Sequence, residues 1–132
     1  DNTAFLAPSS GSVYNIANST TWNQTSDKRI KKNIVNNNQG LEIINQIRVR
    51  NFEYRTLDEI VDFDNPKAVV VEKEGLQIGT IAQEIEEFLP EIIKTESTGV
   101  KQVDTDSMTW YLVNAVKELS AEVEKLKSNK EE

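Results

Sequence analysis

The sequence predicts an α+β fold, in which a small body of strands and short helices precedes a long C-terminal helix. Short β-branched and apolar clusters separated by turn residues lie between positions 47 and 104, and a regular four-and-three apolar spacing follows them. Only 37% of the 132 residues are hydrophobic. This low fraction fits thin cores that neighbouring chains complete, or else a well-solvated monomer.

The first 25 residues are rich in Ser, Thr and Asn, and their only charged residue is Asp1. Short extended pieces and turns fit this composition, and we expect the end of a preceding β-rich region. Because the chain opens with Asp1 rather than Met, we expect it to continue a longer polypeptide. The composition changes abruptly at Ser26, where Ser26 or Asp27 can cap a short charged helix. The sequence therefore predicts two parts, residues 1–25 and 26–132.

Short elements are expected in the next part of the chain. A loop at 36–40 precedes a helix over 41–47, because the apolar residues there have helical spacing. Over residues 47–55 the apolar alternation changes phase, which predicts a strand with a bulge near Asn51. Residues 56–67 are acidic and are expected to form an exposed loop.

A hairpin is predicted from residues 68–71 and 76–81, with Gly75 free to take a positive φ angle in the turn. A short helix over 82–89 follows, and Pro90 ends it. A second strand pair closes this part; it consists of residues 91–95 and 100–104 around the turn at 97–99.

The clearest element is a helix expected over about residues 106–128. Its apolar stripe has heptad spacing, with Val at the a positions and Leu at the d positions; this seam consists of Leu112, Val116, Leu119, Val123 and Leu126. Such a narrow stripe between charged faces favours a coiled coil between chains, and an ordinary helix packed on its own domain is the alternative. Because the Val and Leu pattern alone favours two strands, the seam does not give the chain number. Candidate caps at its start are Asp104, Asp106 and Ser107.

Composition excludes several classes of chemistry. Neither Cys nor His occurs, so Ser-His-Asp and Cys-His catalysis and the usual zinc sites are impossible. We expect no metal and no cofactor. The net charge of −7 argues against nucleic acid as the main partner, although residues 26–55 are locally basic. No apolar run approaches the length of about 20 residues that spans a bilayer.

Hydrolytic chemistry in such a chain requires a hydroxyl with a lysine, or paired carboxylates. Ser26, followed by Lys31, is the best candidate, because a neutral lysine can take the proton of a serine hydroxyl. The lysine pKa of about 10.4 must then be lowered by desolvation or by nearby positive charge. Side chains five positions apart on a regular helix point about 140° apart, so Ser26 must lie outside the helix or receive a lysine from another chain. The simpler alternative makes Ser26 only a helix cap.

Three segments carry a family resemblance. They read Ser-Asp-Lys-Arg-Ile-Lys-Lys-Asn-Ile from Ser26, Gly-Thr-Ile-Ala-Gln-Glu-Ile from Gly79 followed by Leu89-Pro90-Glu91, and Tyr-Leu-Val-Asn-Ala-Val-Lys-Glu-Leu from Tyr111. In this order they resemble the Ser-Asp-x-x-Leu-Lys-x-x-Ile opening, the Gly-x-x-Ala-Gln-Glu-Val and Pro-Glu segment, and the terminal helix of the intramolecular chaperone auto-processing domain. That domain lies at the C-termini of phage endosialidases, tail spikes and tail fibres. The resemblance covers residues 22 to about 128.

The resemblance implies a homotrimer that templates the folding of the upstream β-structured stalk of the same polypeptide and is then cut off. The cut is expected between Thr25 and Ser26, with Ser26 as nucleophile, Lys31 as base and Asp27 in a supporting, orienting or capping role. The chain would belong to a virion tail appendage before cleavage, and the released fragment would remain in the host cytoplasm.

Other motif residues are expected to be structural. We expect Gln83 and Glu84 to cap a helix or to form inter-chain hydrogen bonds. We expect Trp110 and Tyr111 to lie in the core.

Two alternatives stay open. A trimerisation and receptor-contacting fibre tip that never cuts itself would have the same folding features, and the intact mass after expression distinguishes it. A hydrolase that uses the paired acids Asp104 and Asp106 lacks an accompanying aromatic platform in the sequence, and hydrolysis of an added polysaccharide would support it.

Overall fold

The computed structural model describes residues 3–6, 13–16, 22–60 and 70–130. The chain divides into two compact units, Asp1–Asn37 and Asn38–Glu132. The predicted α+β class is confirmed, because small antiparallel sheets are followed by a long C-terminal helix. The predicted division into residues 1–25 and 26–132 stays a prediction.

The first unit contains a three-stranded antiparallel sheet in the order β1-β2-β3. Its strands are β1 (Thr3–Leu6), β2 (Val13–Ile16) and β3 (Trp22–Gln24). This agrees with the short extended pieces that were expected from the Ser-, Thr- and Asn-rich composition. After β3 the chain forms one short 3₁₀ turn, η1 (Lys28–Ile30).

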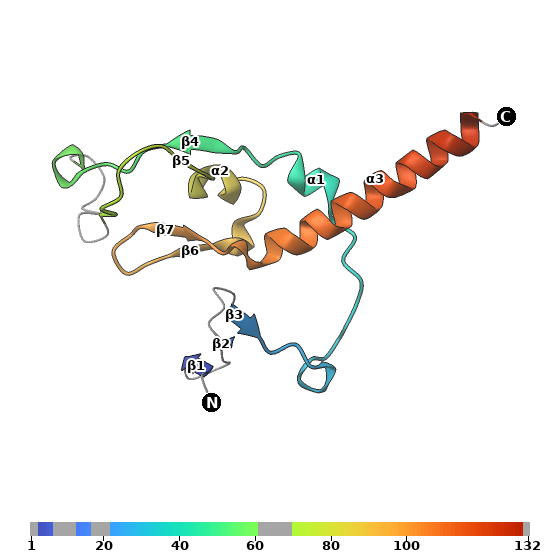
Figure 1. Ribbon diagram of the computed structural model, residues 1–132, viewed down its shortest axis with the longest axis horizontal. Helices are drawn as coiled ribbons and strands as arrows, with labels where there is room; N and C mark the ends of the chain where they lie inside the picture. The colour runs from blue at the N-terminus through green and yellow to red at the C-terminus, as the bar shows by residue number, and fades with distance from the viewer. Residues whose placement is uncertain (1–2, 7–12, 17–21, 61–69, 131–132) are drawn as a thin grey trace. The chain divides into compact units, whose positions relative to one another are not determined.

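The second unit contains two separate antiparallel ribbons and three α-helices among the described residues (Figure 1). In chain order its elements are α1 (Leu41–Ile44), β4 (Arg50–Phe52), η2 (Leu57–Glu59), β5 (Gln77–Gly79), α2 (Ala82–Glu86), η4 (Pro90–Ile92), β6 (Ile93–Thr95), β7 (Lys101–Val103), η5 (Thr105–Ser107) and α3 (Met108–Lys130). Figure 1 places α2 between the β4–β5 and β6–β7 ribbons.

Two strand predictions need correction. The strand β4 pairs with β5 in a regular register, Asn51 opposite Ile78, so the bulge expected near Asn51 is absent. The change of apolar phase has another cause, because Ile47 precedes the strand and packs against the core. The predicted hairpin partner of β5 is also wrong over its described part, since residues 70–71 form no strand; residues 68–69 lie outside the described residues. Gly75 does take the expected positive φ, at 89°.

Local signals were more reliable around α2 and the second ribbon. The helix buries Ile85, and Leu89 just after it is equally buried, each with 1% exposure. Pro90 opens the next 3₁₀ turn as its first residue, but α2 already ends at Glu86, three residues before the predicted end at residue 89. The strands β6 and β7 pair as expected around a turn in which Gly99 has a φ of 87°.

The core of the second unit is small. Its cluster of buried side chains is Ile43, Ile85, Leu89 and Ile92. Burial of each such side chain contributes about 1.5–3 kcal/mol, so the core is thin for its length of chain. Partly buried residues around it include Met108 and Tyr111 from the first turn of α3. The neighbouring Trp110 is 68% exposed, so its predicted core position is wrong.

The long helix agrees with the sequence within two residues at each end. Its start is capped indirectly, because the Asp104 carboxylate accepts the backbone N–H of Asp106 at 3.1 Å at the start of η5. One face packs on the core through the buried Ala115, whereas the five seam residues are 48–65% exposed. Residues 119–130 are exposed throughout, and Figure 1 shows this half of α3 extending past α1. Among the described residues, no helix has the length and apolarity that crossing a membrane requires.

Candidate functional site

Ser26 lies in irregular backbone between β3, which ends at Gln24, and the turn η1, which begins at Lys28. The peptide bond between Thr25 and Ser26 is therefore part of neither a strand ladder nor a helix. Both residues are exposed. Ser26 does not cap η1, since Asp27 occupies that position.

The side chains of Ser26 and Lys31 meet. Lys31 Nζ donates a hydrogen bond to Ser26 Oγ at 2.6 Å. Lys31 is the first residue after η1, and its backbone N–H closes that turn on the carbonyl of Lys28 at 3.2 Å. Because a 3₁₀ turn has about three residues per turn and Ser26 lies outside it, the geometric objection of a regular α-helix does not apply. A lysine from another chain is not needed for this contact.

Asp27 and Arg29 fix the turn between these two side chains. The Asp27 carboxylate accepts a hydrogen bond from the backbone N–H of Arg29 at 2.8 Å. It also accepts hydrogen bonds from the Arg29 side chain, from Nε at 3.0 Å and from Nη2 at 2.8 Å. The hydrogen bond from the Arg29 side chain, followed by that from its backbone, lowers the pKa of Asp27. The role of Arg29 was not predicted from the sequence; an acid followed two positions later by an arginine at a helix start is the signal that would have identified it.

The site is open to water in a single chain. Every residue from Gln24 to Gln39 is exposed, and Gly40 is the first buried residue after the strands. A hydroxyl hydrogen-bonded to a lysine amine is the arrangement of a Ser-Lys pair, in which the amine serves as proton acceptor when it is neutral. The described chain supplies the two partners and their contact but no cover that would exclude water.

The second motif segment has a structural role. Glu84 on α2 receives two hydrogen bonds from Arg50 on β4, at 2.6 and 3.1 Å, and Arg48 lies 3.8 Å from the same carboxylate. The hydrogen bonds from Arg50 lower the pKa of Glu84. This pair ties the first ribbon to α2. The expectation of a structural role for Glu84 is thus met within one chain, whereas Gln83 is exposed.

The paired acids of the hydrolase alternative do not form a site. Asp104 is occupied as the cap of η5, and Lys94 lies 3.6 Å from its carboxylate.

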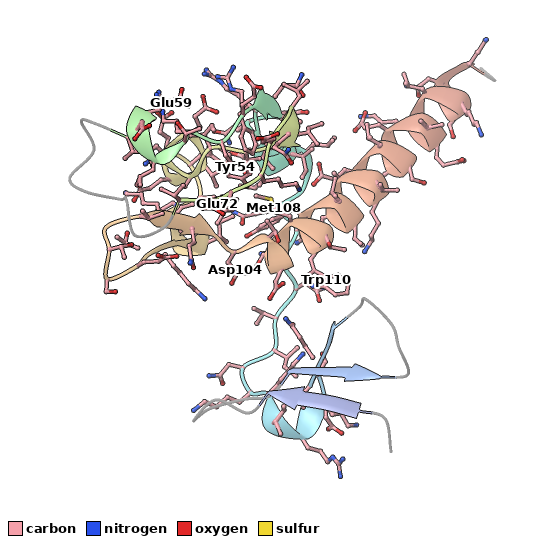
Figure 2. All side chains as sticks on the ribbon, turned by 60° about the vertical axis from the view of Figure 1, so that its left-hand side comes forward. Tyr54, Glu59, Glu72, Asp104, Met108 and Trp110 are labelled. Carbon is pink, nitrogen blue, oxygen red and sulfur yellow. The ribbon has the colours of Figure 1, made fainter. Side chains whose placement is uncertain are left out.

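An open groove of about 950 Å³ lies elsewhere in the second unit, between residues 53–59 and 70–75. Tyr54, Glu59 and Glu72, which are labelled in Figure 2, are among the residues that line it. None of the candidate catalytic residues lines this groove. In the part of the chain that the structure describes, no group of acids is arranged to hold a metal ion.

Comparison with known protein families gives one match. Residues 26–94, more than half of the chain, match the model of a peptidase family described as "Chaperone of endosialidase". The match begins at Ser26 and contains the Ser26–Lys31 pair and the Glu84 motif. No curated protein matches the chain.

Proposed function

We propose that this chain, which belongs to the chaperone of endosialidase family, is the self-releasing C-terminal chaperone of a phage tail fibre or tail spike. It brings three copies together, templates the folding of the upstream stalk, and then separates from it between Thr25 and Ser26. The observation that carries the cleavage step is the 2.6 Å contact between Lys31 Nζ and Ser26 Oγ at the start of the matched segment.

The first chemical step is an attack by Ser26 Oγ on the carbonyl carbon of Thr25. The ring formed in this attack contains that carbon and four atoms of Ser26 itself: N, Cα, Cβ and Oγ. The neutral amine of Lys31 accepts the hydroxyl proton and passes it to the Ser26 nitrogen as the peptide C–N bond breaks. Thr25 is then joined to Ser26 Oγ as an ester. The short tether supplies a large proximity advantage.

Water completes the reaction. Its hydroxyl adds to the Thr25 carbonyl carbon, the ester bond breaks, and its proton returns to Ser26 Oγ. The products are an upstream chain that ends in the Thr25 carboxyl group and a released chaperone that begins with the amine of Ser26. The carboxyl proton passes to that amine, which leaves a carboxylate and an ammonium group. Atoms and charges balance without a cofactor.

Assembly provides what the single chain lacks. A lysine amine in water is protonated at neutral pH, and desolvation favours its neutral form. Because Ser26 and Lys31 are exposed in one chain, we assign their cover to neighbouring chains of the trimer. The exposed seam of α3 is the surface that brings those chains together. Cleavage would then follow association rather than precede it.

Slow folding of the stalk explains why cleavage should follow association. Trimeric β-structured stalks contain many non-local contacts, so they fold slowly and are exposed to misassembly. A C-terminal coiled coil raises the effective concentration of the three chains during that time. Once the template is cut off, the stalk cannot unfold and refold through it, which leaves the product kinetically trapped. The partners are thus the chain's own copies and its own upstream stalk, in a virion appendage before the cut and with a free fragment in the host cytoplasm after it.

Substitution of Ser26 by Ala tests the proposal. In the unchanged chain, mass spectrometry after expression should reveal a fragment that begins at Ser26; in Ser26→Ala the chain should remain intact while it still associates. Ser97→Ala is a matched control, since Ser97 is an exposed serine in the β6–β7 turn of the same chain. An unchanged chain that assembles but stays uncut would instead support the non-cleaving fibre tip.

A further inference from the structure

We propose that residues 39–41, docked against α3, form a latch that positions the cleavage segment for the reaction. We call this contact the Gly40 latch. The inference rests on the proposed self-cleavage and adds to it the positioning residues Gly40, Asn114 and Glu118. None of them touches the reacting atoms; each acts by fixing where the chain that carries Ser26 and Lys31 joins the folded body.

Gly40 lies against the backbone of α3. A Cβ atom at this position would stand 2.6 Å from the backbone nitrogen of Ala115, 2.6 Å from Glu118 Oε1 and 2.7 Å from the carbonyl carbon of Asn114. Two of these three neighbours are main-chain atoms of a helix, which cannot move aside easily. Only glycine allows this close approach, and Ala115 is itself buried at the contact.

Side chains of α3 hold the backbone on both sides of Gly40. Asn114 Nδ2 donates a hydrogen bond to the carbonyl oxygen of Gln39 at 2.9 Å. The backbone N–H of Leu41 donates to Glu118 Oε2 at 3.2 Å. Gly40 is also the N-cap residue of α1, and its carbonyl oxygen accepts the N–H groups of Ile43 and Ile44 at 3.1 and 3.0 Å. The latch therefore fixes both the position of the chain and its direction.

The latch and the seam share the same turns of α3. Asn114, Ala115 and Glu118 alternate along the sequence with the seam residues Val116 and Leu119. Successive helical residues point about 100° apart, so the latch and the seam occupy neighbouring faces of these turns. Chains that cover the seam must consequently approach the place where the latch anchors the cleavage segment.

The connection from the latch to the reactive pair is short. Eight residues, 32–39, lie between Lys31 and Gly40, and the nine Cα–Cα steps from Lys31 to Gly40 span at most about 30 Å when fully extended. Residues 31–39 are exposed and form neither helix nor strand. With one end of this tether fixed beside the seam, the reactive pair is concentrated near the surfaces that neighbouring chains bring, which is an effective-concentration gain. The latch thereby couples association of α3 to cleavage.

The test measures cleavage and association separately in the whole chain. Gly40→Ala, Asn114→Ala and Glu118→Ala should slow the appearance of the Ser26 fragment by about tenfold, because the segment loses its anchored geometry. Association, measured by sedimentation, should remain, since these residues lie outside the seam. Glu118→Gln keeps an acceptor for the Leu41 N–H, and it should restore most of the rate. A purely structural role would lower the melting temperature and association in parallel with the rate.

A second variant leaves the latch untouched. Insertion of nine Gly and Ser residues between Val35 and Asn36 doubles the tether and should slow cleavage about threefold, following the decrease of effective concentration with length. Unchanged rates in the insertion variant and in Asn114→Ala, with an unchanged chain that does cleave, would overturn the latch alone. If the unchanged chain never cleaves, the proposed function fails, and the latch inference fails with it.

Discussion

At the scale of single residues, the site depends on one short turn. Lys31 meets Ser26 because the backbone between them forms a 3₁₀ turn, and Asp27 stabilises that turn by accepting the backbone and side-chain N–H groups of Arg29. Since the hydrogen bonds from Arg29 lower the pKa of Asp27, its carboxylate stays ionised at pH values at which an ordinary aspartate begins to take up a proton. We therefore propose that Asp27 and Arg29 position the reactive pair and take no part in proton transfer.

Substitution of Asp27 separates capping from charge. Asp27→Ala removes the acceptor of the Arg29 N–H, so the turn populates other conformations and the Ser26–Lys31 contact forms less often; we expect cleavage to slow several-fold. Asp27→Asn keeps a side-chain oxygen, and asparagine caps helices about as well as aspartate. A time course by mass spectrometry should thus give a near-normal rate for Asp27→Asn. A rate as low as that of Asp27→Ala would contradict capping and assign the role to the charge.

At the scale of elements, two faces of α3 lie in different surroundings. One face packs on the core through Ala115, and the other exposes a stripe of Val and Leu side chains to water. Because large exposed apolar stripes often mark interaction surfaces, we propose that chains associate through these five residues. Because the stripe lies outside the core, its residues can be changed without unfolding the second unit.

Val116→Asp should prevent association while leaving the chain folded. Val116 is 64% exposed in one chain, but a coiled coil would bury a carboxylate from every chain at this position, and buried unpaired charge is costly. We expect the dissociation constant to rise about a hundredfold or more, as measured by sedimentation equilibrium, and cleavage to fall with it. Lys117→Asp introduces the same residue one position further on the charged face, where association should persist. If both variants lost association to the same extent, the seam would not be the surface through which the chains associate.

The elements also indicate what a sequence can predict. The helix α2, the β6–β7 turn and α3 were predicted because each depends on local signals: a proline after Leu89, a glycine at position 99, and a heptad stripe. The pairing of β4 with β5 and the Gly40 latch were not predicted, because both join segments far apart in the chain. The pair Ser26 and Lys31 was chosen from residue types alone, whereas the 3₁₀ form of the turn between them and the hydrogen bonds from Arg29 to Asp27 were not predicted.

At the scale of the whole molecule, the chain keeps its reactive pair and its α3 seam in different units. Ser26 and Lys31 are in the first unit, and the seam is in the second; both are exposed in one chain. Residues 32–39 connect Ser26 and Lys31 along the chain to the Gly40 latch, which lies beside the seam on α3. Each chain thus contains both partners of the Ser26–Lys31 contact, and the proposal that this contact is catalytic predicts how mixed assemblies should behave.

Mixing two inactive variants tests whether Lys31 acts in its own chain. If the 2.6 Å contact within one chain is the catalytic one, then chains with Ser26→Ala and chains with Lys31→Ala should not cut each other when they assemble together, because neither contains both groups. If a neighbour supplied the lysine, the Lys31→Ala chains would be cut by the amine of Ser26→Ala chains. Unchanged chains mixed with excess Ser26→Ala chains provide the control: they should still be cut at nearly their normal rate, which establishes that mixed assemblies are competent. Appearance of the Ser26 fragment from the two-variant mixture, followed by mass spectrometry with one variant isotopically labelled, would replace the single-chain pair with one shared between chains.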